Sequence, residues 1–150
     1  MFDGMEASQI MTRQVLVVPP ELPLEAAWRT MQRRRVRHLL VTSAGTLLGI
    51  LSDRDILLRA TLADDGAVVV PFAPVATAMT LQPITCSQES SIASIASTMI
   101  DRRLDAVPVM SSGDAVVGLV TSTDLLALLT KRPPEERLPF RFSLEEARDA

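Results

Sequence analysis

Residues 49–55 read Gly49-Ile50-Leu51-Ser52-Asp53-Arg54-Asp55, and residues 118–124 read Gly118-Leu119-Val120-Thr121-Ser122-Thr123-Asp124. Each stretch runs from a glycine through two apolar residues to a hydroxyl residue, and an aspartate follows three positions later. A short apolar run predicts a buried strand, and a serine or threonine with an acidic residue three positions on is typical of a helix start. The stretch therefore predicts a strand that passes directly into a helix, and its recurrence predicts that the chain contains the same folding unit twice.

The similarity between the two halves extends beyond these stretches. Upstream, Ile10-Met11-Thr12 recurs as Ala78-Met79-Thr80, and residues 36–41 match residues 104–109 at the same spacing. From Gly118 on, the spacing is one residue longer, and the extra residue falls in a turn rich in serine and glycine. Turns tolerate insertions, so a single change of spacing at this place fits a duplicated unit.

Each repeat is predicted to fold as β-α-β-β-α. In the first repeat the predicted elements are an extended segment over 15–18, a helix after Pro23, strands over 39–42 and 47–51, and a second helix from about Asp53. Proline suits the first helical turn, and Ser43-Ala44-Gly45 predicts the turn between the strands. One copy has too few layers to cover its sheet, so we predict an α+β fold in which the two repeats pack sheet to sheet.

The predicted boundaries are 8–61 for the first repeat, 75–130 for the second, 62–74 for a linker and 131–150 for a C-terminal tail. In the linker, Asp64-Asp65-Gly66 precedes an apolar run, which predicts a loop with room for one short strand. In the tail, residues 143–146 read Ser-Leu-Glu-Glu, a capping-box pattern that predicts a short helix. Phe140 and Phe142 alternate there, and we expect them to dock on the module or on a partner.

Composition disfavours several classes of function. Aromatic residues make up 3% of the chain, too few for the platforms that stack single-stranded nucleic acid, and a net charge of -3 disfavours duplex binding. One His and one Cys cannot form a zinc cage of the usual kind, and Cys86 is expected to be a half-buried strand residue. No apolar run approaches the roughly 20 residues that span a bilayer, and the N-terminus lacks a secretory pattern, so we expect a soluble cytoplasmic protein. The sequence also lacks a Gly-rich phosphate loop and an activated nucleophile, so we do not expect an enzyme.

The ordered motifs resemble those of the CBS domains, a family named after cystathionine beta-synthase. These motifs are the two Met-Thr pairs, the Val107-Pro108-Val109 strand, and the pattern at 49–55 and 118–124. The resemblance covers about residues 8–130. It implies a tandem CBS-domain pair with pseudo-twofold symmetry, often called a Bateman module, that forms a flat homodimer. It also implies clefts between the repeats that bind AMP, ADP, ATP or S-adenosylmethionine.

Asp55 and Asp124 occupy the positions where this family holds a ribose. One carboxylate can accept a hydrogen bond from each hydroxyl of a ribose cis-diol. Ser52 and Thr121 lie at the predicted helix starts, where hydroxyl and free backbone N–H groups suit a phosphate. The same Ser/Thr-x-x-Asp pattern is also a capping box that needs no ligand, and this alternative stays open.

The resemblance further implies that each cleft takes residues from both repeats. The first cleft would combine Thr12, Val15, Arg37 and His38 with Thr121, Thr123 and Asp124. The second cleft would combine Ser52, Arg54 and Asp55 with Thr80, Ile84, Asp105 and Ala106. A basic pair attracts phosphate and a carboxylate repels it, so we predict that the first cleft binds an adenine nucleotide more tightly.

The favoured hypothesis is a regulatory, ligand-sensing module without catalytic activity or a required cofactor. It would bind an adenine nucleotide such as AMP, ADP or ATP and act through its dimer geometry or a protein partner. One alternative is a structural dimerisation module that binds no ligand, and another is a sensor of S-adenosylmethionine or an NAD-type ligand. The helices that contain Leu57-Leu58 and Leu125-Leu126 have more apolar residues than one core-facing stripe requires. We therefore expect a homodimer formed by helix faces of both repeats. No nucleic acid or membrane partner is expected.

Overall fold

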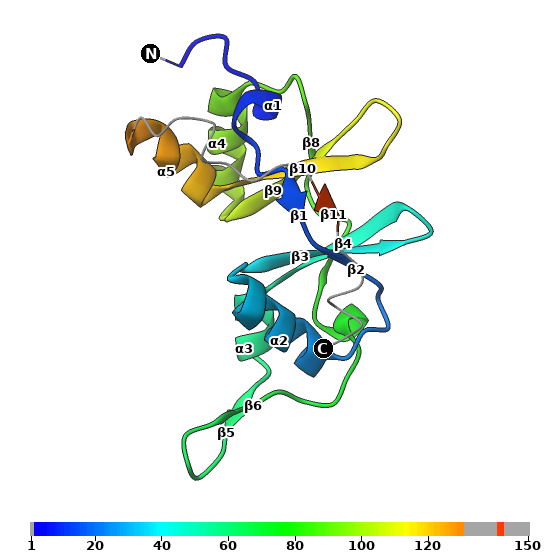
Figure 1. Cartoon of the computed structure of the whole chain (residues 1–150). Helices are drawn as coiled ribbons and strands as arrows, with labels where there is room; N and C mark the ends of the chain where they lie inside the picture. The colour runs from blue at the N-terminus through cyan, green and yellow to red at the C-terminus, as the bar shows by residue number, and fades with distance from the viewer. Residues whose placement is uncertain (1, 131–140, 143–150) are drawn as a thin grey trace. The chain divides into compact units, whose positions relative to one another are not determined.

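The computed structural model of the chain describes residues 2–130 and the backbone of residues 141–142 (Figure 1). Residues 2–130 divide into two compact units. The first-repeat unit contains residues 16–82, and the second-repeat unit contains residues 2–15 and 83–130. Each unit has its own sheet and its own apolar core.

The first-repeat unit is built on a four-stranded sheet in the order β2-β3-β4-β7. Strands β2 and β3 are parallel, whereas β3–β4 and β4–β7 are antiparallel. The elements are β2 (Val17–Val18), α2 (Leu24–Arg34), β3 (His38–Ser43), β4 (Thr46–Ser52), α3 (Asp53–Leu57), β5 (Thr61–Leu62), β6 (Val68–Val69), the 3-10 helix η1 (Val75–Thr77) and β7 (Thr80–Leu81). Ala44 and Gly45 have φ angles of 50° and 80°, the left-handed values that suit a tight hairpin between β3 and β4.

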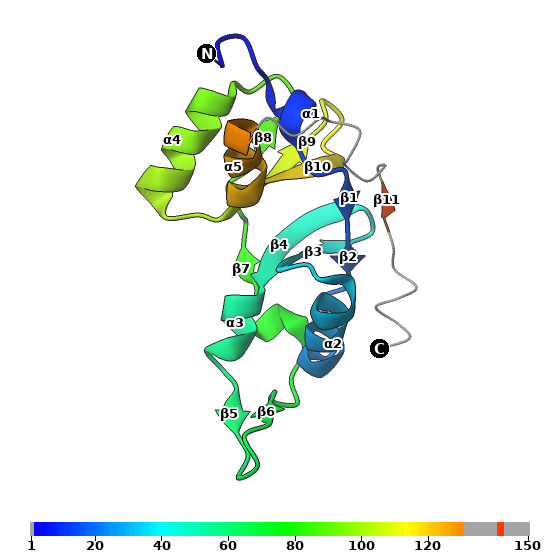
Figure 2. The same ribbon diagram turned by 60° about the vertical axis from the view of Figure 1, so that its left-hand side comes forward.

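The second-repeat unit follows the same pattern around a three-stranded sheet in the order β10-β9-β8. Strands β9 and β10 are antiparallel, and β8 is parallel to β9. The elements are α1 (Ala7–Ile10), β1 (Gln14–Val15), β8 (Cys86–Ser87), α4 (Ile92–Arg102), β9 (Ala106–Met110), β10 (Val116–Thr121) and α5 (Ser122–Thr130). A further strand, β11 (Arg141–Phe142), pairs with β1. Helices α4 and α5 lie on the same side of the β9–β10 hairpin (Figure 2).

Helices α2 and α4 correspond in length, at both ends and in their buried face. Each has 11 residues, and each ends at an arginine in the left-handed conformation, Arg35 (φ 53°) and Arg103 (φ 55°). Pro23 precedes α2, whereas the Ser94 N–H donates to Ser91 Oγ (3.1 Å) at the start of α4. The apolar face that packs on the sheet includes Leu24, Ala27 and Met31 in α2, and Ile92, Ile95 and Met99 in α4. These positions have the helical spacing that predicted both helices.

The two Met-Thr segments are exchanged between the units. The first Met-Thr segment (residues 10–15) lies on β10, where the Thr12 N–H donates to the Leu119 carbonyl (2.8 Å) and the Leu119 N–H donates back (3.0 Å). The second Met-Thr segment (residues 78–82) contains β7, which places Thr80 opposite Ile50 of β4. Each unit is therefore completed by a segment from the other repeat.

Gly49 and Gly118 permit this close approach because they carry no side chain. A Cβ atom on Gly118 would lie 2.5 Å from Sδ of Met11, and a Cβ atom on Gly49 would lie 2.7 Å from the carbonyl oxygen of Thr80. Both distances are shorter than van der Waals contact allows. The glycine that opens each motif is thus required by packing against the exchanged segment.

The predicted α+β fold with two similar repeats is confirmed. The linker differs from the prediction, because residues 61–69 form the antiparallel hairpin β5–β6 instead of a loop with one strand. Gly66, with a φ of 84°, supplies the turn, and the hairpin projects from the first-repeat unit (Figure 1). The sheet-to-sheet packing of the repeats and the boundaries drawn from the sequence stay predictions. The tail helix at 143–146 and the side chains of Phe140 and Phe142 lie outside the described residues.

Candidate ligand-binding site

Asp124 lies in the first turn of α5, directly after β10. Its Oδ2 accepts hydrogen bonds from the backbone N–H of Thr121 (2.8 Å) and from the Thr121 hydroxyl (3.0 Å). In return, the Asp124 N–H donates to Thr121 Oγ1 (3.2 Å). This reciprocal arrangement is a capping box, and it holds Asp124 where only 9% of the residue is exposed.

A second hydroxyl reaches the same carboxylate from the first Met-Thr segment. Thr12 Oγ1 lies 2.8 Å from Oδ1 and 3.0 Å from Oδ2 of Asp124, so its one proton is shared between both oxygens. The two residues are 112 positions apart in the chain, and the pairing of Thr12 with Leu119 brings them together. A hydrogen bond to an ionised group is stronger than a neutral one, so this contact ties the exchanged segment to the helix start.

Asp55 holds the corresponding position in the first-repeat unit but has fewer hydrogen bonds. The Ser52 N–H donates to Asp55 Oδ2 (2.8 Å), and the Asp55 N–H donates to Ser52 Oγ (3.1 Å), which is again a capping box. Thr80, the counterpart of Thr12, is exposed and makes no hydrogen bond to Asp55 within the part of the chain that the structure describes. Asp55 is half-buried, whereas Asp124 is buried.

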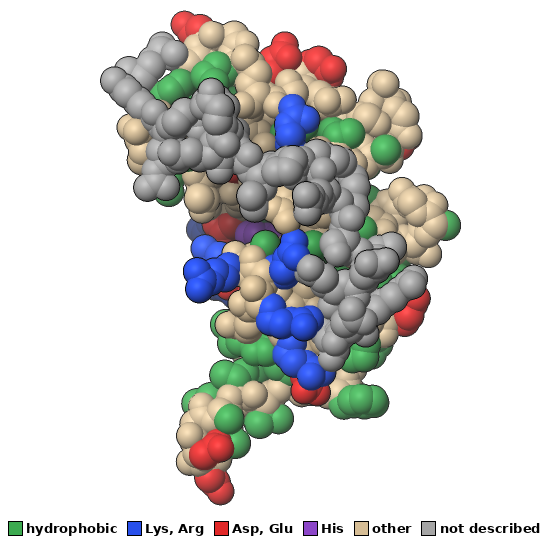
Figure 3. All heavy atoms as spheres, viewed as in Figure 1, with side chains coloured by type: hydrophobic (Ala, Val, Ile, Leu, Met, Phe, Trp, Pro, Cys, Tyr) green, Lys and Arg blue, Asp and Glu red, His purple; other side chains and the backbone are tan. Residues whose placement is uncertain are grey.

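Three further predicted residues flank the Asp55 helix start. His38 is the first residue of β3 and lies opposite Ser52 in the sheet. The carbonyl of Arg37 accepts a hydrogen bond from the Asp53 N–H (2.9 Å), and Arg37 Nε lies 3.4 Å from Asp53 Oδ2. Arg54 is exposed on α3. Basic side chains gather over this unit on the face shown in Figure 3.

Around Asp124, the corresponding positions carry different residues. Ala106 is the first residue of β9 and lies opposite Thr121, as His38 lies opposite Ser52. Asp105 is exposed, and its carbonyl accepts a hydrogen bond from the Ser122 N–H (2.9 Å). The other predicted residues of this unit are Val15, which is buried, and Ile84 and Thr123, which are exposed.

The predicted site residues thus fall into two sets. The second-repeat unit holds Thr12, Val15, Ile84, Asp105, Ala106, Thr121, Thr123 and Asp124. The first-repeat unit holds Arg37, His38, Ser52, Arg54, Asp55 and Thr80. Each predicted cleft draws residues from both sets, and those combinations stay predictions.

Sequence reasoning missed three features of these sets. It assigned Thr12 to the neighbourhood of Asp124, but no spacing in the sequence indicated a direct hydrogen bond between them. It also missed the ion pair between Arg37 and Asp53. The packing role of Gly49 and Gly118 was missed as well, although their recurrence at the start of both motifs was a visible signal for it.

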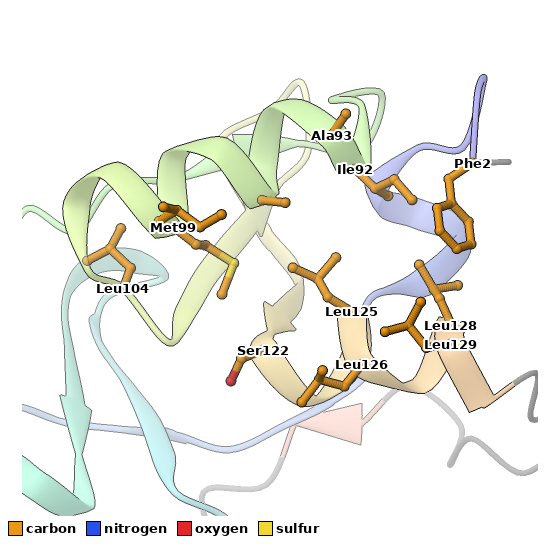
Figure 4. Close-up of a pocket in the computed structure, with 12 residues that line it drawn as sticks. Phe2, Ile92, Ala93, Met99, Leu104, Ser122, Leu125, Leu126, Leu128 and Leu129 are labelled. Carbon is orange, nitrogen blue, oxygen red and sulfur yellow. The ribbon is translucent and has the colours of Figure 1, made fainter.

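An apolar groove lies between α4 and α5 in the second-repeat unit (Figure 4). It encloses about 470 Å³, and Leu125 points from α5 toward α4 within it. Its lining is apolar apart from Ser122 and comprises Phe2, Ile92, Ala93, Ala96, Met99, Ile100, Leu104, Ser122, Leu125, Leu126, Leu128 and Leu129. Ile100, Leu126 and Leu129 are 77%, 62% and 67% exposed, so this face is suited to apolar contact and not to a phosphate.

A smaller cavity of about 120 Å³ adjoins Cys86 in the same unit. Ser90, Ser94 and Thr98 are among the residues that line it. Burial raises the pKa of the Cys86 thiol from 9.0 to about 11, because desolvation disfavours the thiolate. The prediction that Cys86 is a half-buried strand residue is confirmed.

Two further findings concern residues 2–130. No group of three or more His, Cys, Asp or Glu side chains in this range could hold a metal ion. No helix in the same range is both long enough and apolar enough to cross a membrane.

The fold and the two helix starts define an α+β tandem-repeat protein with one hydroxyl–carboxylate pair in each repeat. The model of the CBS domain family matches residues 7–61 and again residues 75–131. The chain therefore belongs to the CBS domain family.

Two curated relatives show how such a pair occurs in other proteins. Inosine-5'-monophosphate dehydrogenase of Korarchaeum cryptofilum is 29% identical over 142 residues, which cover 95% of this chain and 26% of the dehydrogenase. A CBS domain-containing protein of Dictyostelium discoideum is 26% identical over 138 residues, which cover 82% of this chain and 90% of that protein. The chain thus spans about a quarter of the first relative and most of the second.

Three solved structures have a similar fold. CBSX2 in complex with AMP has a TM-score of 0.74 at 21% identity and covers 86% of this chain and 100% of its own. A CBS domain pair in complex with 5'-methylthioadenosine and S-adenosyl-L-methionine has a TM-score of 0.72 at 23% identity, with coverage of 84% and 96%. The cytosolic domain of the Mg²⁺ channel MgtE in complex with ATP has a TM-score of 0.67 at 25% identity, with coverage of 85% and 50%.

Proposed function

We propose that this chain is a non-catalytic regulatory module that binds an adenine nucleotide such as AMP, ADP or ATP through its ribose at Asp124 and Asp55. The observation that carries the proposal is the hydroxyl–carboxylate pair at the strand-to-helix passage of both units. Both caps use Oδ2 of the aspartate, so Oδ1 is not engaged by the cap in either unit. A carboxylate in this arrangement can accept a hydrogen bond from a ribose hydroxyl while it still caps its helix.

The surrounding groups suit the phosphate of a nucleotide. At Asp124, the hydroxyls of Ser122 and Thr123 lie in the first turn of α5, where the helix dipole favours an anion. At Asp55, the exposed Arg54 supplies positive charge, whereas the charge of Arg37 is offset by its ion pair with Asp53. A nucleotide therefore matches the chemistry of both helix starts better than an uncharged sugar would.

The solved complexes support an adenosyl ligand. AMP, ATP, S-adenosyl-L-methionine and 5'-methylthioadenosine share an adenosine group and differ in what is attached to its 5' position. The shared group favours ribose recognition as the common step. S-adenosylmethionine and an NAD-type ligand stay alternatives, because both also carry an adenosine ribose.

We also propose that the module is a cytoplasmic homodimer that signals through its dimer geometry or a protein partner and requires no cofactor. The apolar α4–α5 groove supports the dimer, since Ile100, Leu126 and Leu129 would be removed from water by a second copy. A closed twofold dimer is the commonest assembly of a single kind of chain.

A second candidate function is a structural dimerisation module that binds no ligand. Two observations favour it: both aspartates already complete the capping boxes of their helices, and the groove between α4 and α5 is lined by no charged side chain. The two candidates differ in whether the aspartates contact a ligand.

A thermal-shift panel of AMP, ADP, ATP, S-adenosylmethionine and NAD separates the candidates. A ligand at 100 times its dissociation constant stabilises the folded protein by roughly 2.7 kcal/mol. Calorimetry then compares Asp124→Asn and Asp55→Asn with Asp64→Asn, an exposed aspartate in the β5–β6 hairpin turn that serves as a matched control. If no compound in the panel binds, the dimerisation module is the better description. If AMP binds all three variants equally well, the ribose lies elsewhere.

A further inference from the structure

We propose that the Thr12 hydroxyl competes with the ligand for the carboxylate of Asp124, so that Thr12 sets the affinity and the ribose selectivity of this site. The inference rests on the proposed function, because it assumes that a ribose binds at Asp124. It extends that function by naming a residue of the opposite repeat as an internal competitor.

The geometry of the contact places Thr12 where a diol would bind. Thr12 Oγ1 lies between both carboxylate oxygens, at 2.8 Å from Oδ1 and 3.0 Å from Oδ2. The Thr121 groups, by contrast, contact Oδ2 alone. A cis-diol that donates one hydrogen bond to each oxygen needs the position that Thr12 now holds, whereas the Thr121 groups leave Oδ1 untouched.

Thr12 can release the carboxylate by a change in its side chain alone. Its backbone is held by the reciprocal hydrogen bonds with Leu119 (2.8 and 3.0 Å), and the neighbouring Met11 is buried against Gly118. Rotation about χ1 would move the hydroxyl while these contacts stay in place. Release of Asp124 therefore breaks only the charge-assisted hydrogen bond from Thr12, and the fold of the unit is preserved.

The first-repeat unit provides an internal reference. Thr80 occupies the place of Thr12 in the repeat, but it is exposed and makes no hydrogen bond to Asp55 among the described residues. Asp55 is also less buried than Asp124. The competition is therefore a property of the Asp124 site and not of the motif as such.

The test is calorimetry with AMP on the full chain. All proteins carry Asp55→Asn, so that the measured binding comes from the Asp124 site. Thr12→Val keeps the shape of the side chain and removes the hydroxyl. We expect it to bind AMP about tenfold more tightly, because the unbound carboxylate loses a competing donor of the strength found for charged groups. Thr12→Ser, which keeps the hydroxyl, should bind like the parent. Thr130→Val is the matched control, since its hydroxyl donates to the Ala127 carbonyl in the same helix (2.8 Å) and makes no contact with Asp124 among the described residues.

A second ligand tests selectivity. 2'-Deoxy-AMP has one ribose hydroxyl and can contact one carboxylate oxygen without displacing Thr12 from the other. Thr12→Val should therefore improve AMP binding more than it improves 2'-deoxy-AMP binding, with a gain of no more than about threefold for the deoxy compound. If the valine variant is poorly folded by circular dichroism, Thr12→Ala repeats the test with less bulk next to Leu119.

The outcomes are distinct. Weaker AMP binding by Thr12→Val would mean that the hydroxyl contacts the ligand. An equal gain in affinity for AMP and 2'-deoxy-AMP would mean a general loosening of the site. Either result contradicts the competition. Unchanged AMP binding overturns it as well. If the Asp55→Asn protein binds no AMP while wild type does, the ligand does not use Asp124. The inference about Thr12 is then wrong, whereas the proposed function still stands. If wild type binds no adenosyl ligand, the proposed function itself fails.

Discussion

Asp124 and Asp55 occupy the same place in two copies of one motif, yet their surroundings differ. Both cap a helix through a hydroxyl residue three positions earlier, with closely similar hydrogen-bond lengths. Only Asp124 receives a hydrogen bond from the exchanged segment, and only Asp124 is buried. The local motif therefore specifies the capping box in both units. A residue of the opposite repeat, Thr12, adds a further hydrogen bond to the carboxylate in one unit only.

Alanine substitutions at Asp124 and Asp55 test whether the Thr12 contact makes Asp124 more important for stability. We expect Asp124→Ala to lower the free energy of unfolding by about 2–3 kcal/mol, because it leaves the Thr12 hydroxyl and the Thr121 N–H without their acceptor. Asp55→Ala should cost about 1 kcal/mol, because it removes the acceptor of the Ser52 N–H while Ser52 still caps the helix. Chemical denaturation of both variants measures the difference. Equal losses would show that the Thr12 contact adds nothing to stability.

The helix faces of the two units differ as well. In the second-repeat unit, α4 and α5 border an apolar groove with exposed Ile100, Leu126 and Leu129. In the first-repeat unit, the exposed face of α2 carries Glu25 and Arg29, which form an ion pair at 3.8 Å. Leu57 and Leu58 are exposed on and after the short α3, as the sequence predicted. The expectation that both repeats contribute to a dimer is thus supported unequally by the two faces.

Charge substitutions test which helix face forms the contact of the proposed dimer. Leu126→Glu would place a charge in the apolar groove, and we expect the dimer dissociation constant to rise more than tenfold, which corresponds to about 1.4 kcal/mol. Leu58→Glu, at a similarly exposed leucine, should change it less than about threefold. Sedimentation velocity over a concentration series gives both values. A larger effect at Leu58 would move the dimer contact to the first-repeat unit.

The fold could be predicted because its information is local and duplicated. The periodicity of residues 24–31 and 92–99 indicated helices α2 and α4, and the Ser/Thr-x-x-Asp pattern located both helix starts. The β5–β6 hairpin was missed because its strands have two residues each, too few for a periodic signal.

The candidate site could be predicted only in part. The two capping aspartates follow from a four-residue pattern. The Thr12–Asp124 bond joins residues 112 positions apart and depends on the backbone pairing of Thr12 with Leu119, which no spacing encodes. The difference between the Asp124 and Asp55 surroundings therefore required the three-dimensional arrangement within each unit.

The smallest effect concerns Cys86 and Val18, which hold the same position in the parallel strand pair of each unit. Cys86 lies opposite Val109 and Val18 lies opposite Val41, but Val18 is fully buried and Cys86 is half-buried with a thiol pKa of about 11. The unfolded thiol ionises near its ordinary value of 9.0. Stability from the buried neutral thiol is therefore fully present below about pH 9 and is lost as the pH rises toward 11, because the unfolded state is then favoured by ionisation. Because Cys86 is only partly buried, we expect a loss on the order of 1 kcal/mol or less.

The chain has no tyrosine and its only lysine is Lys131, so few other groups titrate in this range. Denaturation curves at pH 8, 9, 10 and 11 should show this loss in wild type and a smaller one in Cys86→Val, which imitates Val18. Parallel pH profiles for the two proteins would show that the burial of the thiol has no consequence for folding.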